Sequence, residues 1–251
     1  MTISEFRNLK ELVNNYILGV RINDLPKEEV LQKIEGFLSD GKQHYVVLPY
    51  AEFLVKAKED FEFKEILNRA DLCLAEGFGV IFGSRILGQP IKNRIMGVDL
   101  VKAITDRFGQ KRKIFFFGAK EGAAKKAAEN LGRELNIETL GGFIDDSRAI
   151  QKINLSGAEI LFVGLGMPKQ ERWIARNLPQ LPRVKIAIGI GGAFDFISGR
   201  VERAPKWMQK AGFEWLWRLI IQPWRIRRIY RSVAVFLWLI IGEKISRRLK
   251  K

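Results

Sequence analysis

The sequence predicts an α/β fold in which a mostly parallel sheet is flanked by helices. Short apolar runs of strand length recur along the chain, and segments with apolar residues at helical spacing separate them. Strands that alternate with helices in this way form βαβ units and a parallel sheet. With 251 residues and a 47% hydrophobic composition, the chain can bury a substantial core in one such domain and still carry an appendage.

In the first part of the chain, we expect residues 1–15 to be helical or loosely ordered and residues 17–22 to form a short β segment. A helix is expected to start with Asn23 or Asp24 as its cap and to close at Gly41. Further strands are then expected at 45–48 and 72–75, and helices at 51–58, 61–69, 80–87 and 100–108.

The second part of the chain contains the most apolar strands. They are expected at 113–118, 158–164 and 184–190, with helices at 121–134 and 168–177. Asp145 and Asp146 follow a turn and are interpreted as a helix cap. The composition shifts near residues 200–204. We therefore divide the chain into an α/β core, residues 1–202, and a basic, amphipathic, helical appendage, residues 203–251.

The candidate substrate-binding residues follow from the sheet, because ligands of parallel α/β sheets bind at the carboxyl ends of the strands. They come just after the expected strands: Tyr50, Gly118, Gly164, Gln170, Gly192 and Asp195. Glycine turns at these places leave backbone N–H groups open to a phosphate or sugar. A purely structural turn is an equal alternative for Gly189–Asp195, which lacks the third glycine of a dinucleotide fingerprint. An ordinary surface helix is the equal alternative at Gln170.

Glu76 is the candidate general base. It follows an apolar strand and precedes Gly77 and Gly79, so its carboxylate is expected at the same end of the sheet. The alternative is a structural acid that stabilises the N-terminus of the next helix. The residues themselves leave these two interpretations about even.

The chain offers little for metal or covalent chemistry. The single cysteine, Cys73, and the single histidine, His44, are both interpreted as structural residues of apolar runs. No Asp-x-Asp motif occurs. We therefore expect no metal and no cofactor. We expect Arg and Lys side chains to neutralise the negative charge of a leaving diphosphate.

The positive charge is concentrated at the C-terminus. The chain carries 43 Lys and Arg against 28 Asp and Glu, and the stretch from Lys206 onward has twelve basic and two acidic residues. The same stretch is rich in Trp, Ile and Leu, which favours an anionic membrane surface over nucleic acid as its partner. Its apolar run at 233–241 is far shorter than the roughly 20 residues of a membrane span. The N-terminus has no apolar signal-peptide core, so we expect a cytoplasmic protein, peripheral on the inner face of the cell membrane.

Three arginines of this stretch share one helical face. Arg218, Arg225 and Arg228 are seven and ten residues apart, although Pro223 would kink or restart the helix between them. They are either an anion clamp or arginines that snorkel from an amphipathic membrane helix.

Four motifs, in this order, resemble the WecG/TagA/CpsF glycosyltransferase family. They are residues 164–171 (Gly-Leu-Gly-Met-Pro-Lys-Gln-Glu), residues 189–195, Arg203-Ala204-Pro205 and the Trp- and Arg-rich stretch 214–225. The resemblance implies a Rossmann-like core and an inverting, metal-independent reaction. Such enzymes transfer a sugar, often N-acetylmannosamine, from a UDP donor to a sugar on an undecaprenyl (polyprenyl) diphosphate lipid. The products serve cell-wall biogenesis, as teichoic acid or exopolysaccharide.

The resemblance also implies roles for individual residues. The family's appendage docks on the membrane and helps close the site, and its arginines, which match Arg218, Arg225 and Arg228, approach the donor diphosphate. Glu76 would take the proton from an acceptor hydroxyl, and Arg94 would help to stabilise the departing diphosphate. The uridine or the sugar would be held by the remaining candidates, among them Gly118, Gln170 and Asp195.

The chain departs from the family pattern at two strand ends. The family's Thr-Pro-Asn-Ala-Glu is Leu48-Pro49-Tyr50-Ala51-Glu52 here, and the family's Asp-Gly acid is Glu76-Gly77. A hydroxyl and an amide are missing, and the base is one methylene longer. Either the pocket suits a different sugar or acceptor, or Glu76 is not the base.

Two other functions stay open from the sequence. One is a non-catalytic, basic protein that binds a membrane or nucleic acid, and the other is an inactive relative that still binds UDP. A homo-oligomer also stays open, and the sequence does not name the donor sugar or the acceptor linkage.

Overall fold

The computed structural model describes residues 14–132, 134–142 and 144–249, and within these ranges it leaves out the side chains of residues 14, 210, 218, 225, 228 and 231. The expectation for residues 1–15 falls outside the described residues except for Asn14 and Asn15, which begin a strand.

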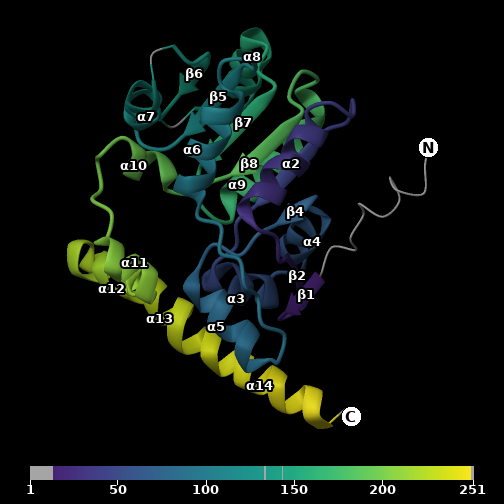
Figure 1. The fold of residues 1–251 in the computed structure, drawn as a ribbon, viewed down its shortest axis with the longest axis vertical. Coiled ribbons are helices and arrows are strands. Elements are labelled where there is room, and N and C mark those ends of the chain that lie inside the picture. Colours follow the sequence, from purple (N-terminus) through teal and green to yellow (C-terminus); the bar gives the residue numbers. More distant parts are fainter. Residues whose placement is uncertain (1–13, 133, 143, 250–251) are drawn as a thin grey trace.

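The centre of the molecule is a six-stranded, all-parallel sheet in the order β4-β3-β8-β7-β5-β6 (Figure 1). Its strands are β3 (His44–Val47), β4 (Leu72–Cys73), β5 (Ile114–Gly118), β6 (Ile137–Leu140), β7 (Ile160–Gly164) and β8 (Ile186–Gly189). The predicted α/β class with a parallel sheet is confirmed. The edge strand β6 was not expected, because its four residues are only partly buried and carry no apolar run.

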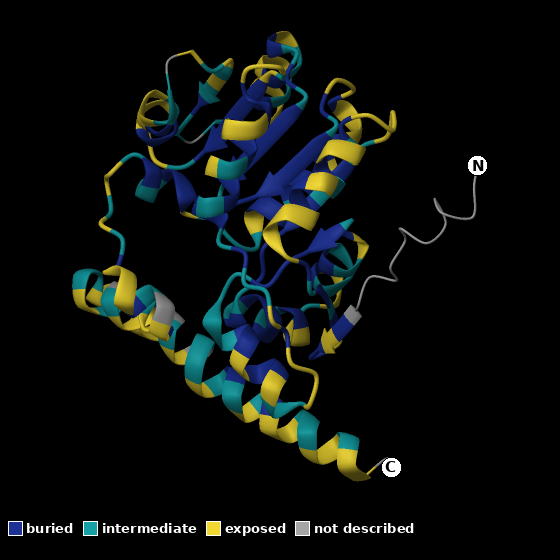
Figure 2. Cartoon of the chain, viewed as in Figure 1, coloured by how far each residue is buried: buried dark blue, intermediate teal, exposed yellow. Residues whose placement is uncertain are grey.

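Helices flank the sheet on both faces (Figures 1 and 2). Those that belong to the α/β core are α2 (Lys27–Phe37), α3 (Ala51–Glu59), α4 (Phe61–Arg69), α5 (Phe78–Ile86), α6 (Gly97–Phe108), α7 (Ala123–Leu131), α8 (Asp146–Ser156), α9 (Lys169–Asn177) and α10 (Ala193–Ile197). One face of the sheet packs against α2, α6, α7 and α10, with Phe116, Phe162 and Phe194 at the centre. The other face packs against α8 and α9 through Phe115 and Phe117. Apolar side chains alternate between the two layers, as a sheet buried on both faces requires.

The segment before α2 differs from its predicted form. Residues 17–22 are not one strand but parts of a hairpin, β1 (Asn14–Ile17) and β2 (Val20–Asn23). Leu18 and Gly19 have φ angles of 52° and 78°. A two-residue hairpin turn with both φ angles positive matches the twist of the strands that it joins.

The cap expected for α2 was also wrong. The helix begins after Pro26 without a side-chain cap and ends at Phe37, before Gly41. Asn23 instead accepts a hydrogen bond from the backbone N of Cys73 at 2.8 Å. The carboxylate of Asp24 accepts bonds from the backbone of the loop before α6. Asn23 therefore joins the hairpin to β4, and Asp24 joins it to the loop before α6. The cap expected at Asp145 is confirmed, since its carboxylate accepts from the N of Arg148 at 2.9 Å.

The strand order reverses between β5 and β7, and this creates the crevice of the sheet. From β5 the chain moves outward to β6, whereas from β7 it moves inward to β8. The segments that follow the two strands therefore leave in opposite directions, and a cleft opens at their carboxyl ends.

The last part of the chain is helical and crosses the carboxyl-end side of the molecule (Figure 1). We refer to residues 206–249 as the C-terminal helices. They are α11 (Lys206–Ala211), α12 (Glu214–Ile221), η2 (Pro223–Arg225), α13 (Ile226–Tyr230), a π-helical turn η3 (Arg231–Val235) and α14 (Phe236–Leu249). Among the described residues, no helix combines the length and the apolar character needed to cross a membrane.

The long helix α14 is fixed to the core at both ends. Phe236 and Ile240 are buried in a cluster with α3, α5 and the hairpin. Gly83 of α5 makes this contact close, since a Cβ there would lie 2.8 Å from Cζ of Phe236. Further along, Glu243 accepts a hydrogen bond from the backbone N of Leu18 at 2.8 Å, and Arg247 donates one to the backbone O of Tyr16 at 2.6 Å.

Candidate active site

A cleft of about 950 Å³ lies at the carboxyl ends of the parallel strands. Its walls are the segments that follow β3, β4, β5, β7 and β8, together with residues of the C-terminal helices. Of the predicted site residues, it brings together Tyr50, Glu76, Arg94, Gly164, Gln170, Gly192 and Asp195. Gly118 is not among the residues that line the cleft, but the next two residues, Ala119 and Lys120, are.

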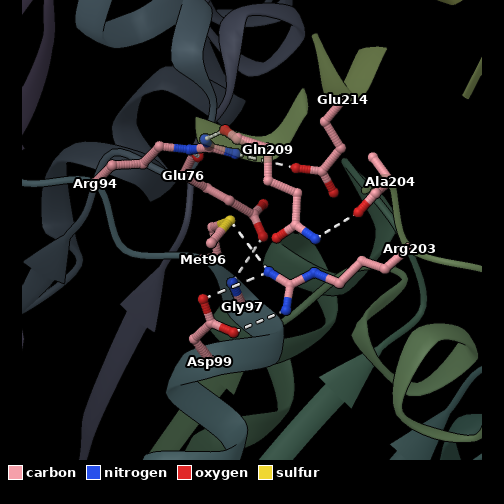
Figure 3. A network of polar contacts seen from close by, with 9 residues as sticks. All are labelled: Glu76, Arg94, Met96, Gly97, Asp99, Arg203, Ala204, Gln209 and Glu214. Carbon is pink, nitrogen blue, oxygen red and sulfur yellow. Dashed lines mark hydrogen bonds and ion pairs between the residues drawn. The ribbon is translucent and has the colours of Figure 1, made fainter. Parts of the chain in front are cut away.

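Glu76 reaches the cleft from the end of β4. Its backbone N donates to the O of Pro49 at 3.0 Å, which ties the end of β4 to the end of β3. Its carboxylate Oε1 accepts from the backbone N of Gly97, the first residue of α6, at 2.8 Å (Figure 3). A helix N-terminus stabilises a carboxylate in this position. The structural interpretation is confirmed, because a helix N-terminus holds the carboxylate. Glu76 also lines the cleft, and its role as a base stays a prediction.

The approach between the ends of β3 and β4 requires a glycine at position 77. A Cβ there would lie 2.6 Å from Cβ of Tyr50. Tyr50 precedes α3 and packs edge-on against Phe53, with ring centroids 4.8 Å apart. The ring of Tyr50 therefore forms part of the cleft wall beside Glu76.

Gly118 and Gly164 let β5 and β7 stay in contact at the mouth of the crevice. Gly118 has a φ of 95°, and a Cβ on it would lie 2.9 Å from the carbonyl carbon of Gly164. The backbone N of Ala119 donates to the O of Gly164 at 2.8 Å. The close approach of the two glycines places Gly164 and Ala119 in the cleft wall.

Gln170 is buried and connects two glycine loops of the cleft. Its Oε1 accepts from the backbone N of Gly191 at 2.9 Å and from the backbone N of Gly166 at 3.2 Å. Its Nε2 donates to Oε1 of Glu171 at 2.5 Å. The loops after β7 and β8 are therefore held together by one side-chain amide.

Glu171 does not line the cleft, but it accepts a hydrogen bond from Gln170, which does, and sequence reasoning missed it. It is fully buried, and burial raises the pKa of its carboxyl to about 7. Its Oε2 has no hydrogen-bond partner among the described residues. One signal was present in the sequence: Glu171 stands three residues before Ile174 and seven before Leu178, on the apolar face of α9.

Asp195 is the acid of the loop after β8. It lies in the first turn of α10, three residues after Gly192, the N-cap. Its Oδ1 is buried without a hydrogen-bond partner among the described residues, although the residue lines the cleft. A buried acceptor left unpaired is costly. A hydroxyl of a bound sugar or ribose would satisfy it.

Two arginines, Arg94 and Arg203, also line the cleft, and Figure 3 shows their polar contacts. Arg94 donates to the backbone O of Glu76 and to the carboxylate of Glu214. Arg203 forms an ion pair with Asp99 at 2.9 Å and contacts Sδ of Met96 at 3.2 Å. Arg203 was missed as a site residue, although it belongs to a motif that carried the resemblance.

The arginines predicted as a clamp fall on C-terminal helices near the cleft. Arg218 belongs to α12, Arg225 to η2 and Arg228 to α13. Their side chains lie outside the part of the chain that the structure describes, so their role stays a prediction. Neighbours on the same helices, Trp215 and Ile229, line the cleft.

The interpretations of His44 and Cys73 as structural residues are confirmed. The ring nitrogens of His44 lie 2.9 Å from Asp71 and 3.0 Å from Asp40, outside the cleft. Cys73 is fully buried, and burial raises the pKa of its thiol to about 12. In the described parts of the chain, no cluster of three His, Cys, Asp or Glu could hold a metal ion. Metal independence itself stays a prediction.

Comparison with known proteins gives one consistent result. The profile of the Glycosyl transferase WecG/TagA/CpsF family matches residues 15–250. A Bacillus spizizenii protein is 34% identical over 199 residues, which cover 77% of each chain. A Bacillus subtilis protein is 32% identical over 233 residues, 90% of this chain and 87% of its own. A Staphylococcus aureus protein is 29% identical over 259 aligned positions, 100% of this chain and 99% of its own. All three are named N-acetylglucosaminyldiphosphoundecaprenol N-acetyl-beta-D-mannosaminyltransferase.

Proposed function

The chain belongs to the WecG/TagA/CpsF glycosyltransferase family, and we propose that it transfers N-acetylmannosamine from UDP to N-acetylglucosamine on undecaprenyl diphosphate. The product is the lipid-linked disaccharide from which a teichoic acid or a related cell-wall polymer is built. The substrates come from the name that the relatives share. The observation that carries the reaction is the position of Glu76 in a cleft at the carboxyl ends of the strands.

Glu76 acts as the general base in this proposal. Its carboxylate removes the proton from the acceptor hydroxyl while that oxygen attacks the anomeric carbon of the donor sugar. The bond between this carbon and the UDP oxygen breaks, and UDP leaves with the electron pair. Attack from the face opposite to UDP inverts the anomeric configuration. The Gly97 amide holds one carboxylate oxygen at 2.8 Å and so fixes the direction of the base.

The donor occupies the crevice between β5, β7 and β8. In this proposal, backbone N–H groups of the loops that follow β5, β7 and β8 bind oxygens of the uridine or the sugar. The unpaired Oδ1 of Asp195 accepts a hydrogen bond from a hydroxyl of the donor. Gln170 holds the loops after β7 and β8 together. Tyr50 forms the sugar-side wall next to Glu76.

The departing diphosphate is stabilised by cations. With no metal in the proposal, this part belongs to Arg218, Arg225 and Arg228 of the C-terminal helices. Arg94 has a different environment from the one expected, because three of its N–H donors are used by protein groups.

In this proposal, residues 203–251 form the membrane-docking appendage, and the C-terminal helices make up most of it. Large apolar side chains are exposed along them: Trp207, Phe213, Trp215, Leu216, Ile220, Trp224, Ile226, Tyr230, Trp238, Ile241, Ile245 and Leu249. Basic residues alternate with these side chains. Such a combination lies in a membrane interface and is attracted by anionic lipids. The enzyme would then meet its lipid-linked acceptor as a peripheral protein of the cytoplasmic membrane face.

A donor screen tests the proposed function. The enzyme is incubated with a short-chain lipid diphosphate that carries N-acetylglucosamine and with UDP-N-acetylmannosamine, UDP-N-acetylglucosamine or UDP-glucose. We expect transfer from UDP-N-acetylmannosamine to be fastest. Faster transfer from another UDP-sugar would mean that Leu48, Tyr50 and Glu76 shape a pocket for a different donor. UDP binding without transfer from any donor would identify an inactive relative.

A further inference from the structure

Arg94 connects the candidate base to the C-terminal helices (Figure 3). Its Nε donates to the backbone O of Glu76 at 2.7 Å, and its Nη1 donates to the backbone O of Gln209, in α11, at 3.0 Å. Its Nη2 forms an ion pair with Oε2 of Glu214, the first residue of α12, at 3.1 Å. One planar guanidinium thus joins Glu76, which follows β4, to α11 and the start of α12, a task that suits its fixed fork of donors.

This ion pair is better shielded from water than a typical surface pair. The side chains of Arg94 and Glu214 are 21% and 19% exposed, whereas the Glu28 partner of Arg107 is 62% exposed. Charges that are partly removed from water are screened less. The Arg94–Glu214 contact is therefore able to hold a defined geometry, which exposed pairs do poorly.

A second set of contacts leads to the same carboxylate. Arg203 begins the connection to the C-terminal helices and binds Asp99 and Met96, on either side of Gly97. Gly97 is the residue whose N–H holds Glu76. The side chain of Gln209 then bonds back to the O of Ala204 at 2.6 Å, which closes the turn into α11. Glu76 is thus held from its backbone through Arg94 and from its carboxylate through α6.

We propose that Glu214 is a positioning residue of the transfer reaction. Its ion pair with Arg94, which we call the clasp, fixes the position of the C-terminal helices relative to Glu76. The helix that Glu214 begins carries Trp215, which lines the cleft, and the backbone of Arg218. The clasp thereby fixes the distance between the group that activates the acceptor and the segment assigned to the leaving diphosphate. This inference rests on the proposed function, because it assigns a task to Glu214 within that reaction.

The clasp differs from the role expected for Arg94 as a ligand of the diphosphate. The carboxylate of Glu214 lies 3.1 Å from the guanidinium of Arg94, so it would repel a diphosphate bound there. Under that alternative, removal of Glu214 would free Arg94 for the donor and strengthen donor binding. Under the clasp, the same change loosens α12 and slows the chemical step.

The test compares Glu214→Ala with Glu159→Ala. Glu159 is a matched control, since it pairs with Arg112 at 2.7 Å, its side chain is 27% exposed, and it does not line the cleft. We expect Glu214→Ala to lower kcat by about tenfold to 100-fold, the cost of a displacement on the order of 1 Å, with donor KM within about twofold. Backbone amides over 206–221 should exchange hydrogen faster. Glu214→Gln should fall between Glu214→Ala and the wild type, and Glu159→Ala should match the wild type in kcat and in amide exchange.

A second pair of variants asks whether Glu214 acts through Arg94. If it does, Glu214→Ala adds little to the defect of Arg94→Gln, so that the two effects are far from additive. The proposal is overturned if Glu214→Ala keeps the kcat and amide exchange of Glu159→Ala. It is also overturned if the two defects multiply, or if donor KM falls while kcat is kept.

Failure of the proposed function would look different. In that case the wild-type enzyme would transfer no sugar to the lipid-linked acceptor, and amide exchange would be the remaining readout. Faster amide exchange over 206–221 in Glu214→Ala, but not in Glu159→Ala, would still support the clasp as a structural contact. Unchanged exchange in Glu214→Ala would show that the clasp does not hold the C-terminal helices.

Discussion

The Glu171 carboxyl is buried beside Gln170, and its protonation state is coupled to folding. Its pKa in the folded protein is about 7, above the ordinary value of 4.5. Between these two values the folded state binds the proton and the unfolded state releases it, so the stabilisation is complete below pH 4.5 and is lost as pH rises through 7. A neutral acid also suits this site, since it avoids a buried negative charge close to Glu76.

Glu171→Gln should therefore remove part of the pH dependence of stability. The amide oxygen of the new residue still accepts from Nε2 of Gln170, while it carries no titrating group. We expect the wild type to lose on the order of 2–3 kcal/mol of unfolding free energy between pH 4.5 and 7 that the variant does not lose. Urea denaturation at a series of pH values measures this. Parallel curves for the two proteins would show that folding does not raise the pKa of Glu171.

For individual residues, the sequence predicted which side chains lie at the cleft better than it predicted what they contact. Tyr50, Glu76, Gln170 and Asp195 meet in one cleft, because parallel strands bring their carboxyl ends to the same edge. Glu171 and Arg203 were missed because their importance depends on what they contact. Glu171 lies on the buried face of α9, and Arg203 bonds to Asp99 in the first turn of α6.

Among the elements, α14 has two faces with separate tasks. Phe236 is fully buried between α3 and α5, whereas Trp238, two residues later, is 73% exposed. We expect Phe236→Ala to lower the free energy of unfolding by about 3–5 kcal/mol, the usual cost of a deleted aromatic core side chain. Trp238→Ala should change it by less than about 0.5 kcal/mol. Equal losses in urea denaturation would mean that α14 does not pack on the core as described.

The elements that the sequence predicted correctly are those with a strong apolar period. The Phe-rich strand β5, the buried strands β7 and β8, and the helix α4 all lie where apolar spacing placed them. One β segment was expected at residues 17–22, and the turn at Leu18 and Gly19 that makes it a hairpin was missed. The edge strand β6 was missed because only one of its four residues is fully buried. Asn23 and Asp24 resembled a helix cap locally, but long-range partners use their side chains.

At the scale of the whole molecule, charge and exposed apolar surface coincide at the C-terminal helices. Trp207, Trp224 and Trp238 are 65%, 73% and 73% exposed. We expect the protein to bind vesicles that contain phosphatidylglycerol, with affinity that falls as salt is added. Replacing all three by Ser should weaken binding at least about tenfold, because each large side chain contributes on the order of 1.5 kcal/mol or more when buried.

Leu155→Ser is the control for this experiment. Leu155 is 80% exposed on α8, away from the C-terminal helices, and its replacement should leave vesicle binding unchanged. Flotation on a density gradient gives the bound fraction. The membrane assignment would be wrong if the triple variant floated like the wild type, or if the C-terminal helices bound DNA and not vesicles.

The central claim is that this cleft performs an inverting sugar transfer with Glu76 as its base. The most direct measurement is the single-turnover rate of transfer from UDP-N-acetylmannosamine to the lipid-linked N-acetylglucosamine acceptor, for the wild type and for Glu76→Gln. Glu138→Gln on the edge strand serves as the control. We expect Glu76→Gln to lower the rate by about 10²-fold to 10⁴-fold while UDP binding by calorimetry is kept. A full rate in Glu76→Gln would contradict the account.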